Sequence, residues 1–312
     1  MPEKPTTWKY ELPALGFVFG AWLLYAALSL LSPVTGGAKY HMTSDDFQLL
    51  RLTIIIPTLI IWMLAVRGAI AFKNYASLIT GGQEHKGVNL MADGLLWLVA
   101  YLIVSALLSA LDPFVTSHAI ANSFIVIRDH IPPLFGLVGF LLLYYGSNQL
   151  KSVAKFQTWT WTWDTMLIMA LFAIFAIGFV LDFSSTAVMP ATGAMVTSTS
   201  IVPLKVLLFT LVLPYLIAWF VGILAAINIY RYSQNVSGIL YRRALRSLVW
   251  GIVTVVLFAS AVQLTNFADR FLSSLSLGAL LAIVYIFIIF YALGFVFIWM
   301  GAKQLKRLEA LE

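Results

Sequence analysis

Long apolar runs separated by short polar segments occupy most of this chain. Eight runs are long enough to cross a bilayer, since a hydrocarbon core about 30 Å thick needs about 20 residues of helix. They cover residues 12–32, 49–72, 90–111, 126–146, 166–183, 203–229, 246–265 and 277–300. Each run is continuous and lacks the two-residue alternation of a membrane β-barrel strand. The pattern therefore predicts an all-α integral membrane protein with eight transmembrane helices.

The composition supports this class of protein. Of the 312 residues, 61% are hydrophobic and 10% are charged, whereas about a quarter of a soluble domain is charged. A soluble fold cannot cover so much apolar surface with polar groups, which excludes an ordinary soluble enzyme, a nucleic-acid-binding domain and a disordered protein. The chain also contains no cysteine, which excludes disulfides, thiolate metal sites and thiol catalysis.

Basic residues concentrate in alternate connecting segments. If the N-terminus lies in the cytoplasm, 14 Lys and Arg side chains fall on the cytoplasmic side and 5 on the opposite side. Cytoplasmic segments of membrane proteins carry such an excess, so both termini are predicted to be cytoplasmic. Topology then explains the net charge of +6, and no nucleic-acid partner is expected.

The second half of the chain repeats the first. Sliding the sequence by 157 residues places Thr53 on Thr210 and Pro57 on Pro214, among nine identities in the 29 positions from 53 to 81. A second block with the pattern GFx5GxxQLK ends each half, at an offset of 155 residues. The fold predicted from this repetition is two tandem four-helix repeats, at residues 1–155 and 156–312. Because four helices return the chain to the same side, the repeats are expected to share a pseudo-two-fold axis along the membrane normal.

Two prolines lie inside corresponding predicted helices. A proline removes a helical hydrogen bond, so Pro57 and Pro214 each free the carbonyl of the threonine four residues earlier, Thr53 and Thr210. Paired helix breaks at equivalent positions are the best sequence indication of a transporter binding site, which makes these four residues candidate substrate-binding residues. The alternative interpretation is that the prolines only shape the bundle.

A second group of candidates lies on the predicted outer side of the first half. Arg128, Asp129 and His130 precede two prolines at the start of the fourth span and are further candidate substrate-binding residues. Together with His41 and His118, His130 is also a weak candidate for a metal ligand, since imidazole binds transition metals. The spacings match no known metal pattern, and the alternative is a solvated rim with helix caps.

Few polar residues lie deeper in the predicted spans. Arg67 is expected to extend towards the cytoplasmic interface, and Asp93 to open the third span, where a carboxylate favours a helix N-terminus. The alternative is an ion pair between them that guards a pathway. Asn228 is expected to make hydrogen bonds between helices.

Several classes of chemistry have no residues to support them. No histidine or lysine lies near the centre of a predicted span, which leaves no ligand for haem or chlorophyll and no lysine for retinal. The sequence has neither HExxH nor a glycine-rich phosphate loop, so no cofactor and no enzymatic activity are expected.

The remaining functions are those of a membrane protein without catalysis. The first hypothesis is a transporter or channel-like protein for an apolar or weakly polar solute, bound at the interface between the repeats. The second is a structural or accessory subunit of a membrane complex, and the third is an outer-face sensor or metal-binding protein. The expected partners are membrane lipid and either further copies of the chain or other membrane proteins.

Overall fold

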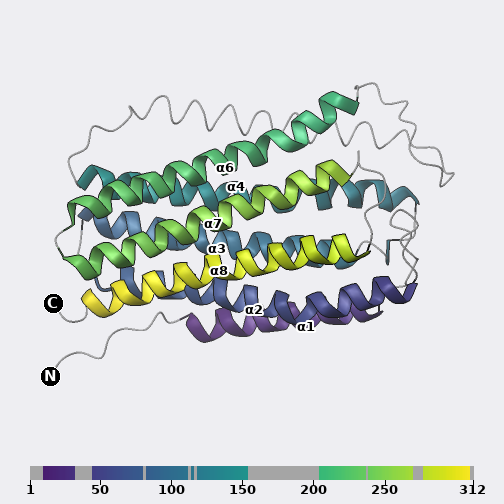
Figure 1. Cartoon of the computed structure of the whole chain (residues 1–312), viewed down its shortest axis with the longest axis horizontal. Coiled ribbons are helices and arrows are strands. Elements are labelled where there is room, and N and C mark those ends of the chain that lie inside the picture. Colours follow the sequence, from purple (N-terminus) through teal and green to yellow (C-terminus); the bar gives the residue numbers. More distant parts are fainter. Residues whose placement is uncertain are drawn as a thin grey trace.

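The computed structural model describes residues 10–31, 44–79, 82–111, 114–115, 118–153, 204–236, 238–269 and 277–309. These residues form seven α-helices and no strand (Figure 1). The helices are α1 (Glu11–Leu31), α2 (Ser44–Ala76), α3 (Gly82–Leu111), α4 (His118–Val153), α6 (Leu204–Asn235), α7 (Ile239–Asp269) and α8 (Leu277–Glu309). The predicted span at 166–183 and the histidine at position 41 lie outside the described residues.

Several of these helices have the length and hydropathy of membrane spans. Within the described residues, five stretches are long and apolar enough to cross a bilayer: Glu11–Leu31, Leu52–Ala76, Gly82–Leu111, His130–Leu150 and Leu281–Glu309. The predicted all-α architecture is thereby confirmed for the described part of the chain, and it is the architecture of a polytopic membrane protein.

The helices extend beyond the apolar runs that predicted them. The clearest case is α3, which begins at Gly82 and not near residue 90. Asp93 therefore lies about three turns inside the helix, and the expectation that it opens the helix is wrong. The first turns of α3 carry polar residues, which lie before the apolar run that predicted this span.

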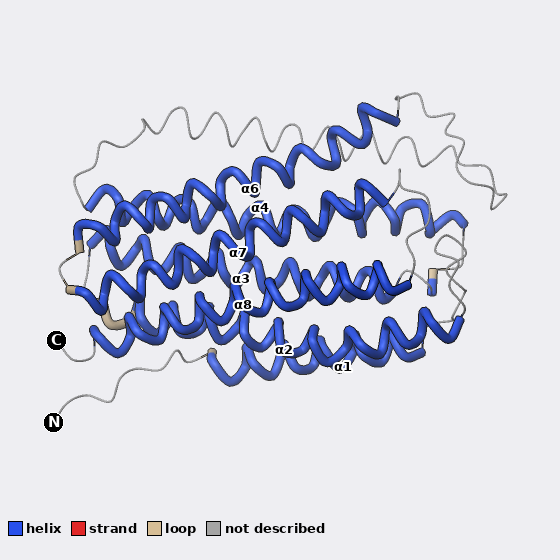
Figure 2. The backbone as a smooth tube through the Cα atoms, viewed as in Figure 1, coloured by secondary structure: helices blue, strands red, loops and turns tan. Residues whose placement is uncertain are grey.

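Six of the helices form a closed ring. Helix α2 packs on α3, α3 on α4, α4 on α6, α6 on α7, α7 on α8, and α8 returns to α2. Helix α1 lies outside this ring, against α2 and α3. All seven run along a common axis, and the turns after α2 and α6 lie at the end where the C-terminus is found (Figures 1 and 2).

We call this end of the bundle the basic end. Its helix termini carry Lys73, Lys86, Arg231, Arg242, Arg243, Lys306 and Arg307. A glycine makes one of its turns possible: Gly238, between α6 and α7, has φ of 110°, which side chains with a Cβ rarely adopt.

Glycines bring two pairs of helices into backbone contact. A Cβ added to Gly94 of α3 would lie 2.7 Å from the carbonyl oxygen of Gly139 in α4. A Cβ added to Gly251 of α7 would lie 2.7 Å from the carbonyl oxygen of Gly294 in α8. Small residues allow this close packing, which is how helices associate where water provides no driving force.

The core is shared by all seven helices. Its largest fully buried side chains include Trp62, Phe72, Met91 and Phe295. Helix α1 buries only Val18 among its described side chains, although Trp22 Nε1 donates to the carbonyl oxygen of Ile55 at 2.8 Å. Helix α1 is therefore held more loosely than the ring.

A tyrosine–carboxylate cluster, formed by Tyr75, Glu84, Tyr232, Tyr241 and Glu309, crosses the ring at the basic end. Tyr241 donates to Glu309 Oε2 at 2.9 Å, so the Tyr75 hydroxyl is the donor in its hydrogen bond to Tyr241. Tyr232 donates to Glu84 Oε1 at 2.7 Å. Burial raises the pKa of Tyr232 and of Tyr241, so both hydroxyls keep the protons that they donate. These bonds join α2 to α7 and α6 to α3, helices that are not neighbours in the ring.

Candidate functional site

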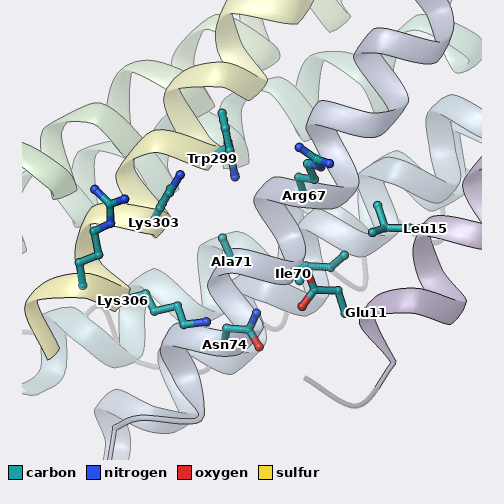
Figure 3. A pocket seen from close by; sticks show the side chains of 10 residues that line it. Glu11, Leu15, Arg67, Ile70, Ala71, Asn74, Trp299, Lys303 and Lys306 are labelled. Atoms are coloured by element: carbon teal, nitrogen blue, oxygen red, sulfur yellow. The ribbon is translucent and has the colours of Figure 1, made fainter. Parts of the chain in front are cut away.

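A pocket of about 490 Å³ opens between α1, α2 and α8 near the basic end (Figure 3). Its lining includes four basic side chains, one carboxylate and one amide among apolar groups. The lining residues are Glu11, Leu15, Arg67, Ile70, Ala71, Asn74, Trp299, Lys303, Lys306 and Arg307. Its volume lies within the usual range for small-molecule sites, about 300–1,000 Å³.

Helix α2 supplies the floor of the pocket. Arg67, Ile70, Ala71 and Asn74 follow the spacing of one helix face. Ile70 and Asn74 are buried, with 3% and 4% of their surface exposed, whereas Arg67 is exposed. The floor is thus apolar with one buried amide, and a guanidinium stands at its edge.

Helix α8 forms the basic wall. Trp299, Lys303 and Lys306 lie at successive turns of one face, and Arg307 follows. The ammonium of Lys303 lies 5.1 Å from the centre of the Trp299 ring, a cation–π distance that orients this lysine. Lys306 and Arg307 occupy the last turn, where the helix dipole favours positive charge.

Helix α1 closes the third side with Glu11 and Leu15. Glu11 lies in the first turn, where a carboxylate is favourable, and it extends towards α2 (Figure 3). The four basic side chains and this carboxylate give the lining a net charge of +3, that is, four minus one. The pocket therefore attracts anions.

The side chains of the pocket are suited to binding. Arginine and lysine are the residues that recognise phosphate and carboxylate groups, and arginine can do so with two parallel hydrogen bonds. The apolar floor and the indole of Trp299 can accept hydrocarbon beside such a group. The site can thus hold an anionic group attached to an apolar body.

The predicted proline site falls elsewhere. Thr53 and Pro57 are half-buried in the part of α2 remote from the basic end, and α2 continues as one helix through Pro57. Thr210 and Pro214 lie within α6, but their side chains are outside the described part of the chain. Their approach across the interface stays a prediction.

The second group of candidates lies on α4. His130 is buried, with 3% of its surface exposed, and Arg128 is half-buried. The side chains of Asp129 and His118 belong to the residues that are not described. Among the side chains that are described, no three His, Cys, Asp or Glu residues could hold a metal ion, so the metal hypothesis stays a prediction.

Asp93 forms an ion pair with Lys73, whereas the alternative interpretation of the sequence paired it with Arg67. Lys73 Nζ lies 2.6 Å from Asp93 Oδ1 and 2.7 Å from Asn89 Oδ1. Arg67 instead lines the pocket. Asn228 does bond between helices, as predicted: it donates to side chains of α4, Ser147 Oγ and Asn148 Oδ1, both at 3.3 Å.

The pocket was not predicted from the sequence, because its basic residues were explained only by their predicted location on the cytoplasmic side. One available signal was the arrangement of Lys303, Lys306 and Arg307 on one face of a helix. The approach of that face to Arg67, more than 230 residues away in the chain, leaves no local pattern. Comparisons with protein-family models, curated proteins and solved structures found no match for this chain.

Proposed function

We propose that this polytopic membrane protein binds the anionic head group of a membrane amphiphile in the pocket between α1, α2 and α8. The observation that carries the proposal is a lining that combines four basic side chains with an apolar floor. The position of the pocket beside the loosely packed α1 also supports it, because a lipid can then enter from the bilayer with its chain still in hydrocarbon.

We further propose that the basic end faces the cytoplasm, with both chain termini on that side. The 14 to 5 division of basic residues supports this orientation. The cytoplasmic leaflet carries the anionic lipids that basic segments attract, so the proposed ligand is available where the pocket opens.

In this proposal the chain consists of two tandem four-helix repeats, with an eighth helix at 166–183. The packing of the glycines supports the repeat: Gly94 meets Gly139 as Gly251 meets Gly294, and these positions are related by the offsets 157 and 155. The two contacts between the proposed repeats, α2 with α8 and α4 with α6, are likewise equivalent.

The tyrosine bonds fit the same relation. An offset of 157 converts Tyr75 into Tyr232 and Glu84 into Tyr241. The bond of Tyr75 to Tyr241 and the bond of Tyr232 to Glu84 are therefore equivalent links across the proposed axis.

The proposed repeats differ where the pocket lies, which supports a specialised function there. The counterparts of Arg67, Lys303 and Arg307 are neutral: Leu224, Asn148 and Ser152. Lys306 corresponds to Lys151, and Asn74 corresponds to Arg231, so positive charge is present in both repeats but at different positions. The counterpart of Ala71 is Asn228, whose amide donates to Asn148 at 3.3 Å. The equivalent of the Arg67 and Lys303 position is thus occupied by neutral side chains.

This proposal modifies the transport hypothesis. The sequence favours an apolar or weakly polar solute, and an amphiphile meets that description except at its head group. Thr53, Pro57, Thr210 and Pro214 remain proposed site residues of a transport pathway. A structural or accessory subunit, in contact with other membrane proteins or with further copies of the chain, is the alternative that such lipid binding also permits.

The test compares two double variants of the full chain in detergent micelles. Arg67→Gln/Lys303→Gln removes two pocket charges, whereas Arg231→Gln/Arg243→Gln removes two exposed charges from the same end. Binding of phosphatidylglycerol and of phosphatidylcholine is measured by native mass spectrometry. We expect the pocket variant to lose about tenfold or more in affinity for phosphatidylglycerol, and the control variant less than about twofold.

Two results would contradict the proposal. An equal loss of affinity in both variants would mean that phosphatidylglycerol binding depends only on the overall charge of the basic end. Phosphatidylcholine binding as tightly as phosphatidylglycerol would mean that the basic side chains recognise no anion.

A further inference from the structure

We infer that the pocket selects a phosphomonoester group over a phosphodiester, an inference that rests on the proposed function and names its ligand class. The first observation is charge. The lining carries +3, and a phosphodiester brings one negative charge, whereas a phosphomonoester brings about 1.5 to 2 at pH 7.

Glu11 reduces this difference without abolishing it. Its carboxylate extends from α1 into the same pocket, where it provides one negative charge to the basic side chains (Figure 3). It repels both classes of ligand, and a ligand with nearly two negative charges more than a ligand with one. The net charge of +3 that remains attracts the more highly charged ligand more strongly.

The placement of the donors gives a second reason. Arg67 approaches from α2, whereas Lys303, Lys306 and Arg307 approach from α8. A phosphomonoester has three terminal oxygens that accept hydrogen bonds, whereas a phosphodiester has two. The third oxygen allows one phosphate to bind both walls.

The size of the pocket fits a phosphate together with part of its carrier. The volume of about 490 Å³ exceeds what one phosphate group fills, and Leu15, Ile70 and Trp299 supply apolar surface for the remainder. The shared chemistry is a phosphomonoester, and its source is either a lipid head group or a soluble phosphate ester.

The experiment titrates the full chain in micelles with phosphatidic acid, phosphatidylglycerol and glycerol 3-phosphate at pH 7.5. We expect phosphatidic acid to bind about tenfold more tightly than phosphatidylglycerol. The second pKa of a phosphomonoester is about 6, so phosphatidic acid loses negative charge when the pH is lowered to 5.5. We expect its affinity to fall at this pH, and the affinity of phosphatidylglycerol to stay nearly unchanged. Glu11→Gln should tighten the binding of both lipids and raise the ratio of their affinities, because the lost carboxylate repels a phosphomonoester more strongly than a phosphodiester.

Each outcome has a defined consequence. If the two lipids bound with equal affinity, and if Arg67→Gln/Lys303→Gln bound neither, the phosphomonoester selectivity would be overturned. The proposed function would remain intact. Glycerol 3-phosphate binding as tightly as phosphatidic acid would support the phosphomonoester and overturn the lipid as its source. A preference for phosphatidic acid that survives in Arg67→Gln/Lys303→Gln would overturn the assignment to this pocket.

Discussion

Single hydroxyl groups link helices that are not neighbours in the ring. Tyr241 of α7 accepts a hydrogen bond from Tyr75 of α2, and it also donates one to Glu309 of α8. Each buried hydrogen bond contributes about 1 kcal/mol to stability, and more where its partner is charged. The tyrosine–carboxylate cluster therefore stabilises the ring at the basic end.

The variant Tyr241→Phe tests this role. It leaves the ring in place, removes the donor to Glu309 and leaves Tyr75 without its acceptor. We expect a loss of about 1–3 kcal/mol in the free energy of unfolding, seen as a lower thermal unfolding temperature in micelles. Tyr230→Phe is the control, since this tyrosine is exposed and its ring still lies under Arg246. Equal stability of the two variants would contradict the role given to the cluster.

Which polar residues meet could be predicted only in part. Asn228 was predicted to bond between helices because an amide in a membrane helix needs a partner. The partner of Asp93 was not predictable from charge and position alone, since both Arg67 and Lys73 lie on the preceding helix. The angular position around α2 selects Lys73, which lies 2.6 Å from Asp93, and turns Arg67 towards α8.

The helices themselves were the most predictable feature of the chain. A bilayer demands a continuous apolar stretch of about 20 residues, so hydropathy locates each described helix. The ends were less predictable, as the start of α3 at Gly82 shows, because a helix continues through polar residues once it leaves hydrocarbon. Contacts between α2 and α8 join distant parts of the sequence, which is why the pocket had to come from the structure.

Glycine contacts set how closely the helices pack, which a matched pair of alanine variants can measure. Gly251→Ala places a methyl group 2.7 Å from the carbonyl oxygen of Gly294, whereas Gly16→Ala in α1 meets nothing within 4 Å. Both variants replace a helical glycine with alanine, so the difference between their free energies of unfolding reports the close contact between α7 and α8. We expect Gly251→Ala to lower the free energy of unfolding by about 1–3 kcal/mol relative to Gly16→Ala.

Thermal unfolding followed by tryptophan fluorescence provides this comparison. If Gly251→Ala were as stable as Gly16→Ala, the contact between α7 and α8 would not be close enough to exclude a methyl group. Such a result would contradict the close packing described for α7 and α8.

For the molecule as a whole, the first question is its orientation in the membrane. The chain contains no cysteine, so single cysteines can be introduced without background. Ser77→Cys lies on the exposed turn after α2, and Phe114→Cys lies between α3 and α4 at the other end. We expect a membrane-impermeant maleimide to label Phe114→Cys in intact cells and Ser77→Cys only after permeabilisation. The reverse pattern would place the basic end outside the cytoplasm.

The described helices form a ring with α1 outside it, and the two proposed halves are alike in packing and different in chemistry. At one junction Ala71 lines the pocket with Lys303 and Arg67, and at the equivalent junction Asn228 donates to Asn148. This asymmetry supports the proposal that one interface of the bundle holds an anionic amphiphile.

A cryo-electron microscopy map of the protein in nanodiscs that contain phosphatidic acid would reveal a bound amphiphile. We expect head-group density between Arg67 of α2 and Lys303 of α8, with its hydrocarbon chain beside α1. We expect no such density beside Asn228. An unoccupied pocket between α1, α2 and α8, or equal density at both junctions, would contradict the proposed function.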